Sequence, residues 1–421
     1  MNALTDRLAQ RLPVFYGYVM LPLALLLQIG SSPGQTFAVA AFTPSLLSAL
    51  QLTESQLGFA YMLGTVCAAI PLAWIGPATD RVGLKSVACV VVLGLSAACL
   101  FASTVTNFVQ LLAAFFLLRF LGQGAMTLLA TNTKAMWFRA RLGRVAAALS
   151  VGSALTFAWV PDWLSSAIAV YGWRATYQGI GVLLVVIILP SLMLLYRDRP
   201  EDVGQCVDGV SADPAAENRS HKSEAEESSA VTLASAIRTR SYAILGLSNI
   251  FWAMAGTGVL FYLLTLCEDR GLDDSKLLFK ILGLSMLASQ LSGGVLADFC
   301  RLNRLFGSGV CLIAVALTWL ALDSTLIGIR GFAALFGAGQ GLLISVTSVV
   351  MLRFYGREHL GSIRGAIWCG TVAGSGCGPL IMGLFKDNTG SYDGAILCFA
   401  AAMLPLSVAA WFIRPPTKQP A

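Results

Sequence analysis

Runs of about 20 apolar residues recur along the whole chain, and short polar segments separate them. A helix of that length crosses the hydrocarbon core of a bilayer. The pattern predicts twelve spans, at roughly 15–44, 53–78, 86–106, 108–137, 145–170, 174–196, 241–267, 275–299, 304–322, 325–353, 361–385 and 393–413. We therefore expect an all-α membrane protein that crosses the bilayer many times.

Composition agrees with this interpretation and excludes several other classes of protein. The chain is 57% hydrophobic and 12% charged, about half of the roughly 25% that is usual in soluble domains. Its ten cysteines form no C-x-x-C pair and no Cys/His set with metal-ligand spacing, so we interpret them as small packing residues and expect no metal and no cofactor. The chain has no phosphate-binding G-x-x-x-x-G-K-[ST] loop, no H-E-x-x-H and no G-x-S-x-G, so neither an ATPase nor another enzyme is expected.

The distribution of positive charge predicts the orientation in the membrane. If both termini lie in the cytoplasm, 21 of the 28 Lys and Arg residues lie in the cytoplasmic segments. The other seven are Arg119, Arg174, Arg270, Lys276, Lys280, Arg330 and Lys386. Cytoplasmic loops of membrane proteins carry such an excess. We therefore expect a multi-pass protein of the cytoplasmic (inner) membrane, and the net charge of +6 does not indicate a nucleic-acid partner.

An internal repeat divides the spans into two sets of six. Gly76-Pro-Ala-Thr-Asp80 recurs as Gly294-Val-Leu-Ala-Asp298, 218 residues later, and Gly122-Gln123-Gly124 recurs as Gly339-Gln340-Gly341. At the offset of 218, Gly143, Gly152, Pro161 and Gly172 recur as Gly361, Gly370, Pro379 and Gly390. Matches in one order across several helices predict two pseudo-symmetric six-helix bundles, 1–196 and 241–421. The polar segment 197–240 is then a cytoplasmic linker.

The repeat, the spans and the linker resemble the major facilitator superfamily over nearly the whole chain. The most specific match is Gly76-x-x-x-Asp80-Arg81-x-Gly83-x-Lys85, the loop signature of that superfamily between spans two and three. "WFRARLGRVAAAL", "YGWRATYQGIG", "RDRPEDVGQCVDG" and "HLGSIRGAIWCGTVAGSGCGPLIMG" are similar to monocarboxylate and oxalate/formate carriers. The resemblance implies a secondary transporter whose two bundles alternate access to a site near the midplane.

The loop signature also has a direct physical interpretation as a cytoplasmic gate. Its members are Gly76, Asp80, Arg81, Gly83 and Lys85, together with Asp298 of the second copy. A carboxylate at a helix end can accept from backbone N–H groups at the start of a neighbouring helix and pair with a cation. We expect Asp80 to act in this way, with Arg81, Lys85 or Arg144 as its partner. The alternative is that these are ordinary charges of cytoplasmic loops.

Candidate substrate-binding residues lie deep in the spans, where an unpaired charge costs at least ~2.5–3.5 kcal/mol. Arg119 lies roughly 18 Å from the outer end of span four, near the midplane. Lys280 and Arg330 lie closer to the outer ends, where snorkelling is the alternative. The remaining candidates are polar or aromatic and lie beside Pro33 and Gly34, which break span one, or beside the glycines of span seven; they are Gln35, Thr36, Asn249 and Trp252. Close helix packing at these small residues is the alternative.

The stretch Trp159–Leu164, "WVPDWL", places an acid and a proline inside span five. Pro161 corresponds to Pro379 in the repeat, and we predict helix hinges at both and at Pro33. Asp162 has no counterpart, because Leu380 stands at its place in the second half. We predict that Asp162 couples transport by pairing with Arg119 or by taking a proton; exposure to a wet outer vestibule is the alternative.

These features together predict a secondary active transporter for a small organic anion, a mono- or dicarboxylate. An excess of buried cations attracts anions, and a guanidinium holds a carboxylate with two parallel hydrogen bonds. Coupling to protons and exchange against a second anion both remain open. An exporter of a neutral or hydrophobic compound and a sensor without flux are the alternatives. The expected partners are the substrate and the lipid bilayer, and we expect a monomer.

Overall fold

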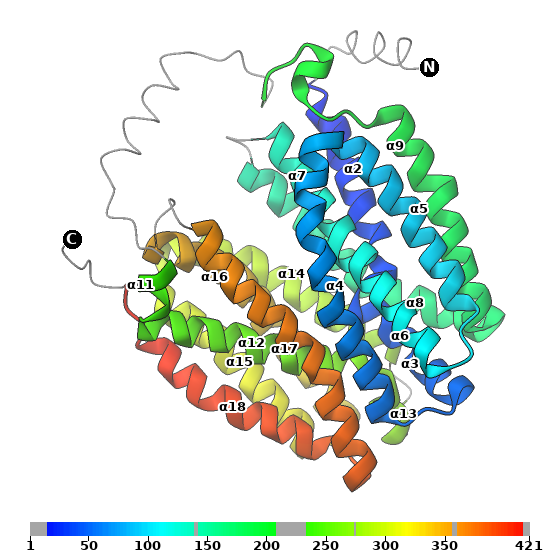
Figure 1. Ribbon diagram of the computed structural model, residues 1–421. Coiled ribbons are helices and arrows are strands. Elements are labelled where there is room, and N and C mark those ends of the chain that lie inside the picture. The colour runs from blue at the N-terminus through cyan, green and yellow to red at the C-terminus, as the bar shows by residue number, and fades with distance from the viewer. Residues whose placement is uncertain (1–14, 139–141, 208–232, 273–274, 356–359, 416–421) are drawn as a thin grey trace. The chain divides into compact units, whose positions relative to one another are not determined.

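The computed structural model describes residues 15–138, 142–207, 233–272, 275–355 and 360–415, and nearly all of them are helical (Figure 1). The long helices of the first half are α2 (Gly17–Gly30), α3 (Thr36–Leu50), α4 (Glu54–Val82), α5 (Leu84–Ser103), α6 (Phe108–Leu118), α7 (Thr127–Trp137) and α8 (Leu142–Leu183), with the shorter α9 (Leu189–Leu195). Those of the second half are α12 (Arg240–Phe261), α14 (Ser275–Phe299), α15 (Leu302–Leu322), α16 (Leu326–Tyr355), α17 (Leu360–Thr389) and α18 (Asp393–Trp411), with the short α11 (Leu233–Ile237) and α13 (Leu263–Asp269).

Ten segments among the described residues are long and apolar enough to cross a membrane. One of them, Ala148–Leu195, holds both span five and span six, because α8 runs through a sharp bend at Gly172. Span one is not among the ten because it is broken into α2, the 3₁₀ turn η1 (Ser32–Gly34) and α3. The twelve spans that the hydrophobic pattern predicts are therefore all present as helices.

The internal repeat has a structural counterpart at the bends that follow spans five and eleven. Gly172 and Gly390, which correspond in the repeat, have φ of 78° and 76°. Residues with a Cβ rarely adopt this left-handed conformation, so glycine is required at both bends. The two halves therefore reverse direction by the same local geometry, which is why these glycines recur in the sequence.

The second glycine of the repeated Gly-Gln-Gly faces the corresponding span in each half. A Cβ on Gly124 would lie 3.1 Å from Leu72 Cδ1 of α4, and one on Gly341 would lie 2.9 Å from the backbone nitrogen of Gln290 in α14. Leu72 and Gln290 lie 218 residues apart, which is the offset of the other repeated positions, and the two glycines lie 217 residues apart. Small residues thus bring span four against span two and span ten against span eight.

The chain forms two compact units whose limits differ from the two halves of the repeat. Unit 1 comprises Met1–Gln35, Cys67–Thr156 and Ala167–Ser228. Unit 2 comprises Thr36–Val66, Phe157–Ser166 and Ser229–Ala421. Unit 2 thus joins α3, the first part of α4 and a short stretch of α8 to the helices of the second half. The bundles 1–196 and 241–421 and the linker 197–240 remain predictions from the repeat.

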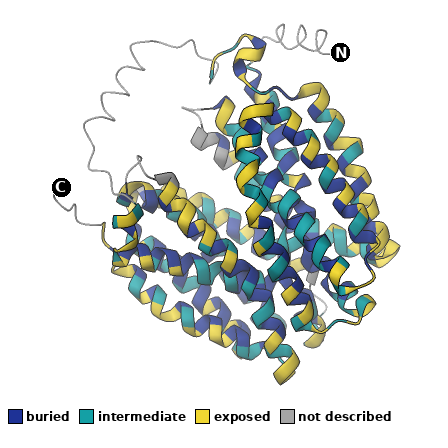
Figure 2. Cartoon of the chain, in the orientation of Figure 1, coloured by how far each residue is buried: buried dark blue, intermediate teal, exposed yellow. Residues whose placement is uncertain are grey.

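Burial follows the pattern of a membrane protein within each unit. Exposed positions recur along many of the helices (Figure 2). Large apolar side chains are among them, such as Trp74, Trp163 and Phe299, which are 65%, 69% and 82% exposed. Exposed apolar surface on this scale requires a lipid environment. The residue next to Trp163 is Asp162, which is less exposed, so one turn of α8 presents an aromatic ring outward and a carboxylate inward.

Candidate functional site

At the break in span one, a glycine packs directly against the backbone of span four. Span four contains a π-helical stretch, η2 (Arg119–Met126), between α6 and α7. A Cβ on Gly34 would lie 2.1 Å from the carbonyl oxygen of Leu118, and one on Gly122 would lie 2.9 Å from Gly34 Cα. Only glycine permits this approach. Stretches of π-helix inside an α-helix occur frequently at functional sites, and this one begins at a predicted site residue, Arg119.

Arg119 is only 3% exposed, and its Nη1 donates to the carbonyl oxygen of Gly34 over 3.0 Å. A carbonyl that a broken helix leaves without its usual partner must be satisfied in another way. Arg119 therefore supports the interrupted backbone of span one, which is a role that the sequence interpretation did not include. Its role as a substrate ligand remains a prediction.

Side chains satisfy the other polar groups of the break. Gln35 has an extended conformation, and its Nε2 donates to Ser31 Oγ and to Thr127 Oγ1 over 3.1 and 3.2 Å. The Ser31 and Ser32 hydroxyls donate to the carbonyl oxygens of Gln28 and Ile29. Thr36, the first residue of α3, bonds the Tyr61 hydroxyl over 2.8 Å. Gln35 and Thr36 therefore help to fix the two ends of the break.

A polar cavity of about 60 Å³ lies within unit 1, between α2, α7 and α8. It is lined by Ala24, Gln28, Ala130, Thr131, Lys134, Leu149, Ser150 and Ser153. Lys134 is the only charged residue of the lining, and its amino group makes no hydrogen bond or ion pair within the described part of the chain. The sequence interpretation missed this cavity. The available signal was the spacing of three residues between Thr131 and Lys134 and between Ser150 and Ser153, which places each pair on one helix face.

Asp162 pairs with Lys280 of α14, and this corrects the predicted pairing with Arg119. The distance from Lys280 Nζ to Asp162 Oδ2 is 2.7 Å, and the two side chains are 31% and 15% exposed. Both residues belong to unit 2. Lys280 therefore turns toward a carboxylate and does not reach for headgroups. The cation that pairs with Asp162 comes from span eight, whereas the prediction placed it in the adjacent span four.

The remaining substrate candidates are Asn249, Trp252 and Arg330. Asn249 is 7% exposed, and its Nδ2 donates to the carbonyl oxygen of Leu245, one turn earlier in α12. Trp252 in α12 and Arg330 in α16 are half-buried. Asn249 thus uses one of its donors within its own helix, and the substrate roles of all three residues remain predictions.

A carboxylate does hold a helix start at the loop signature, but it is Asp198 and not Asp80. Asp198 Oδ1 accepts from the backbone N–H of Lys85 over 2.6 Å, at the start of α5. Gly83 has φ of 90°, and a Cβ there would lie 2.7 Å from Asp198 Oδ2, so two constraints require glycine. Asp80 and Arg81 are exposed, and Asp80 makes no hydrogen bond within the described residues.

The other predicted gate and hinge residues are placed as follows. Gly76 is half-buried, and its carbonyl oxygen accepts from the Thr79 hydroxyl. The side chain of Asp298 lies outside the described residues. Pro33 is buried in η1, at the break that was predicted there. The helices α8 and α17 keep helical dihedral angles through Pro161 and Pro379, so hinges at these two residues remain predictions.

Apolar helices, a broken first span, an internal repeat and buried polar sites define the class of this protein. It is a membrane transporter of the secondary type and not an enzyme. The sequence model of the Major Facilitator Superfamily matches residues 24–368, and the chain belongs to that superfamily.

Solved structures with the same fold are distant in sequence. A bacterial homolog of the human lysosomal transporter Spinster, in an inward-facing and occupied conformation, is 14% identical with a TM-score of 0.70, and the match covers 94% of this chain and 96% of that one. The nucleoside transporter NupG is 12% identical with a TM-score of 0.68, and the match covers 94% of this chain and 99% of that one. A search of curated proteins found no match. Likeness at this level establishes the fold alone.

Proposed function

We propose that this transporter carries a small organic anion, a mono- or dicarboxylate, across the cytoplasmic membrane with both of its termini inside. The observation that carries the proposal is the cavity around Lys134. An ammonium group in a polar cavity whose described lining contains no carboxylate attracts an anion. Gln28 and Thr131 add side chains that can donate to a carboxylate, whereas the Ser153 hydroxyl already donates to the carbonyl oxygen of Leu149.

The size of the cavity matches a small anionic group. About 10–15 Å³ of such space is enough for one water, so about 60 Å³ holds several waters or a small polar group. A carboxylate group, with two oxygens, is small enough to enter it. We therefore assign the cavity to the charged end of the substrate, and the remainder of the substrate would extend out of it.

The balance of charge within the spans also favours an anion. Arg119, Lys134, Lys280 and Arg330 are cations in described membrane helices, whereas Asp162 is the acid in the middle of a span. Ionisable groups within spans mark substrate and ion pathways by default. Asp162 and Lys280 pair with each other, and Lys134 is the cation that lines the cavity.

The Asp162–Lys280 pair supports coupling. An anion that binds Lys280 would remove the cation from Asp162 and leave a poorly solvated carboxylate. That carboxylate would then take up a proton, so one anion and one proton would cross together. Exchange of one anion for another at Lys280 requires no proton. The two coupling modes therefore differ in what they require of Asp162.

The test is uptake of labelled mono- and dicarboxylates by proteoliposomes that contain the purified protein. One set carries a pH gradient, and a second set is preloaded with an unlabelled carboxylate. Lys134→Met should raise KM by roughly 10- to 100-fold, because a hydrogen bond to a charged group contributes about 1.5–3 kcal/mol. Arg238→Met removes one exposed charge and should stay within about twofold of the wild type.

Uptake by vesicles that contain the Asp162→Asn variant distinguishes the two coupling modes. Loss of stimulation by the pH gradient, with exchange retained, would indicate proton symport through Asp162. Unchanged pH dependence would remove the proton role of that residue. The proposal as a whole fails if no carboxylate is transported or competes, whatever the gradient.

A further inference from the structure

The start of α4 is capped by a carboxylate that comes from span eleven. Asp387, near the end of α17, accepts from the backbone N–H of Glu54 over 3.2 Å and from that of Ser55 over 2.9 Å. The Ser55 hydroxyl also donates to Asp387. The first N–H groups of a helix have no partner within the helix, so this acid replaces the cap that a local side chain usually provides. All of these residues belong to unit 2.

The two helices touch at backbone distance beside this cap. A Cβ on Gly383 of α17 would lie 2.5 Å from the carbonyl carbon of Glu54, and one on Gly58 of α4 would lie 2.6 Å from the carbonyl oxygen of Pro379. The Tyr262 hydroxyl donates to the carbonyl oxygen of Glu54 over 2.5 Å. We call this region the α4–α17 contact. It joins a span of the first half to spans of the second half, so movement of the two halves must break it.

The side chain of Glu54 is poorly satisfied in this contact. Its Oε2 is buried and has no hydrogen-bond partner within the described residues. The charged and titratable groups that act on it are Asp387 and Lys386 of α17, Asp269 of α13, and the hydroxyl groups of Tyr262 and Tyr392. Two of these neighbours are acids, and only Lys386 is a cation.

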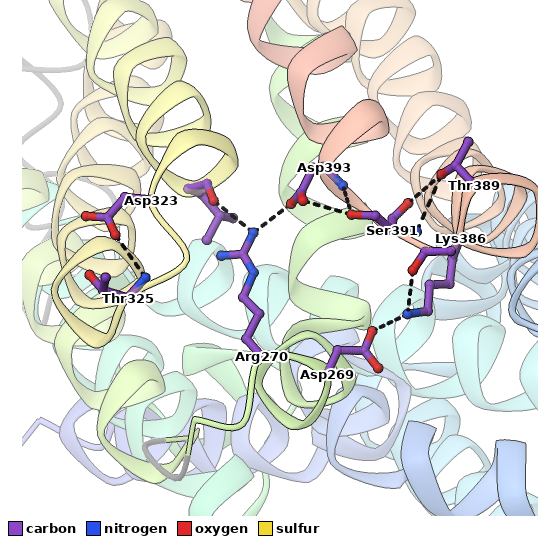
Figure 3. A network of polar contacts seen from close by, with 10 residues as sticks. Asp269, Arg270, Asp323, Thr325, Lys386, Thr389, Ser391 and Asp393 are labelled. Carbon is purple, nitrogen blue, oxygen red and sulfur yellow. Dashed lines mark hydrogen bonds and ion pairs between the residues drawn. The ribbon is translucent and has the colours of Figure 1, made fainter.

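Two cations at this end of unit 2, Lys386 and Arg270, are already paired (Figure 3). Lys386 binds Asp269 and also donates to the carbonyl oxygen of Gly390. Arg270 binds Asp393 over 2.7 Å. An ionised Glu54 would therefore add an unpaired negative charge beside Asp387 and Asp269. A buried charge without a partner is costly, and a carboxyl group in such a place tends to take a proton.

Tyr392 offers the partner that a protonated Glu54 requires. Its side chain is 1% exposed, its ring stacks on that of Tyr262, and its hydroxyl group has no hydrogen-bond partner within the described residues. Burial, together with the nearby Glu54 carboxylate and Tyr262, raises the pKa of Tyr392, so the phenol stays neutral and its oxygen can accept. The Tyr392 hydroxyl can donate to a Glu54 carboxylate or accept from a protonated Glu54, so it can serve as a partner in both states.

We propose that Glu54 is a proton-binding site that stabilises the α4–α17 contact. A proton taken from water binds a Glu54 carboxylate oxygen, and the resulting O–H donates to the Tyr392 hydroxyl oxygen. Opening of the contact hydrates Glu54, which then returns the proton to the same side of the membrane. Acid on that side, which the charge bias predicts to be the outside, therefore favours the closed contact. The inference does not depend on the identity of the substrate.

The test is hydrogen–deuterium exchange of the full-length protein in nanodiscs, followed in a peptide that spans the start of α4. Its amides are protected while Asp387 and Tyr262 hold the contact, and their exchange reports its opening. Wild type, Glu54→Gln and Glu268→Gln are compared at about pH 5 and about pH 8, on either side of the range in which a buried carboxyl titrates. Each observed exchange rate is divided by the intrinsic rate of an unprotected amide at the same pH, which removes the intrinsic pH dependence of exchange. Glu268 is an exposed acid of α13 outside the contact, so it is the matched control.

In the wild type, opening should increase by more than tenfold from acid to base, because one linked proton changes an equilibrium by up to tenfold per pH unit. Glu54→Gln, which resembles the protonated form, should stay protected within about twofold at both pH values. Glu268→Gln should follow the wild type. Tyr392→Phe keeps the ring and removes a hydroxyl that can donate to the ionised Glu54, so the transition should move to higher pH. The proposal is overturned if Glu54→Gln retains the pH dependence of the wild type, or if the wild type shows none.

Discussion

The ion pair between Asp162 and Lys280 gives a quantitative prediction that separates a buried pair from a surface pair. The perturbations are Lys280→Met, Asp162→Asn and the double variant. At an effective dielectric constant of about 20, two unit charges 4 Å apart attract by about 4 kcal/mol, and desolvation offsets much of that. Breaking a fully buried pair costs about 3–5 kcal/mol, whereas an exposed pair contributes less than about 1 kcal/mol.

The exposures of the two side chains predict an asymmetry between the single variants. Asp162 is 15% exposed, so Lys280→Met leaves a short, poorly hydrated carboxylate without a cation, and we expect a loss of about 2–3 kcal/mol. Lys280 is 31% exposed and has a long stem, so after Asp162→Asn its amino group can reach water, and we expect about 1–2 kcal/mol. The double variant should lose about 2 kcal/mol, which gives a coupling energy of about 2 kcal/mol.

The assay is the free energy of unfolding in mixed micelles titrated with a denaturing detergent, followed by the fluorescence of the nine tryptophans. Arg238→Met, which removes one exposed charge, is the control and should change little. Single-variant losses that add to the double-variant loss within about 0.5 kcal/mol would refute the pair as an energetic unit. A larger loss for Asp162→Asn than for Lys280→Met would refute the argument from exposure.

Two further predictions concern backbone contacts in the folded protein, and the same unfolding titration measures both. Gly378→Ala should destabilise by about 1–3 kcal/mol, because its Cβ would lie 2.0 Å from the carbonyl oxygen of Met254, whereas Gly365→Ala in the same helix has open space and should be neutral or stabilising by up to ~1 kcal/mol. Equal effects of the two substitutions would contradict the packing argument. Asp198→Asn should cost about 1 kcal/mol because it weakens the cap on the start of α5, and Asp80→Asn should leave the unfolding free energy unchanged. The reverse order would restore the predicted role of Asp80 in this conformation.

The sequence predicted those parts of the fold that depend on properties of neighbouring residues in the chain. The length of an apolar run decides whether a helix can cross the bilayer, and this property can be read from the chain alone. The break in span one was predicted from Pro33 and Gly34, because these residues remove a donor and loosen the backbone wherever they stand. The repeat predicted equivalent bends at Gly172 and Gly390, and the two residues share the same positive φ.

Functional contacts were predicted less well, because they join residues that are far apart in the sequence. Depth along a span suggested Arg119 as the partner of Asp162, but depth does not specify which face of a helix meets which neighbour. The structure instead pairs Asp162 with Lys280, which is more than a hundred residues away. The carboxylate at the loop signature was expected from the motif, yet Asp198 provides it from beyond span six.

The sequence by itself determined that this is a twelve-span membrane protein of two related halves. The length of each apolar run and the spacing of the repeated glycines can be read directly from the chain. Only the tertiary structure decided where its charges are satisfied. Lys134 lines a cavity because α2, α7 and α8 meet around it. Among the described residues Glu54 forms no ion pair, and Lys386 and Arg270 are bound to other acids. Both outcomes follow from the rotation and crossing of helices, which side-chain packing over the whole fold determines.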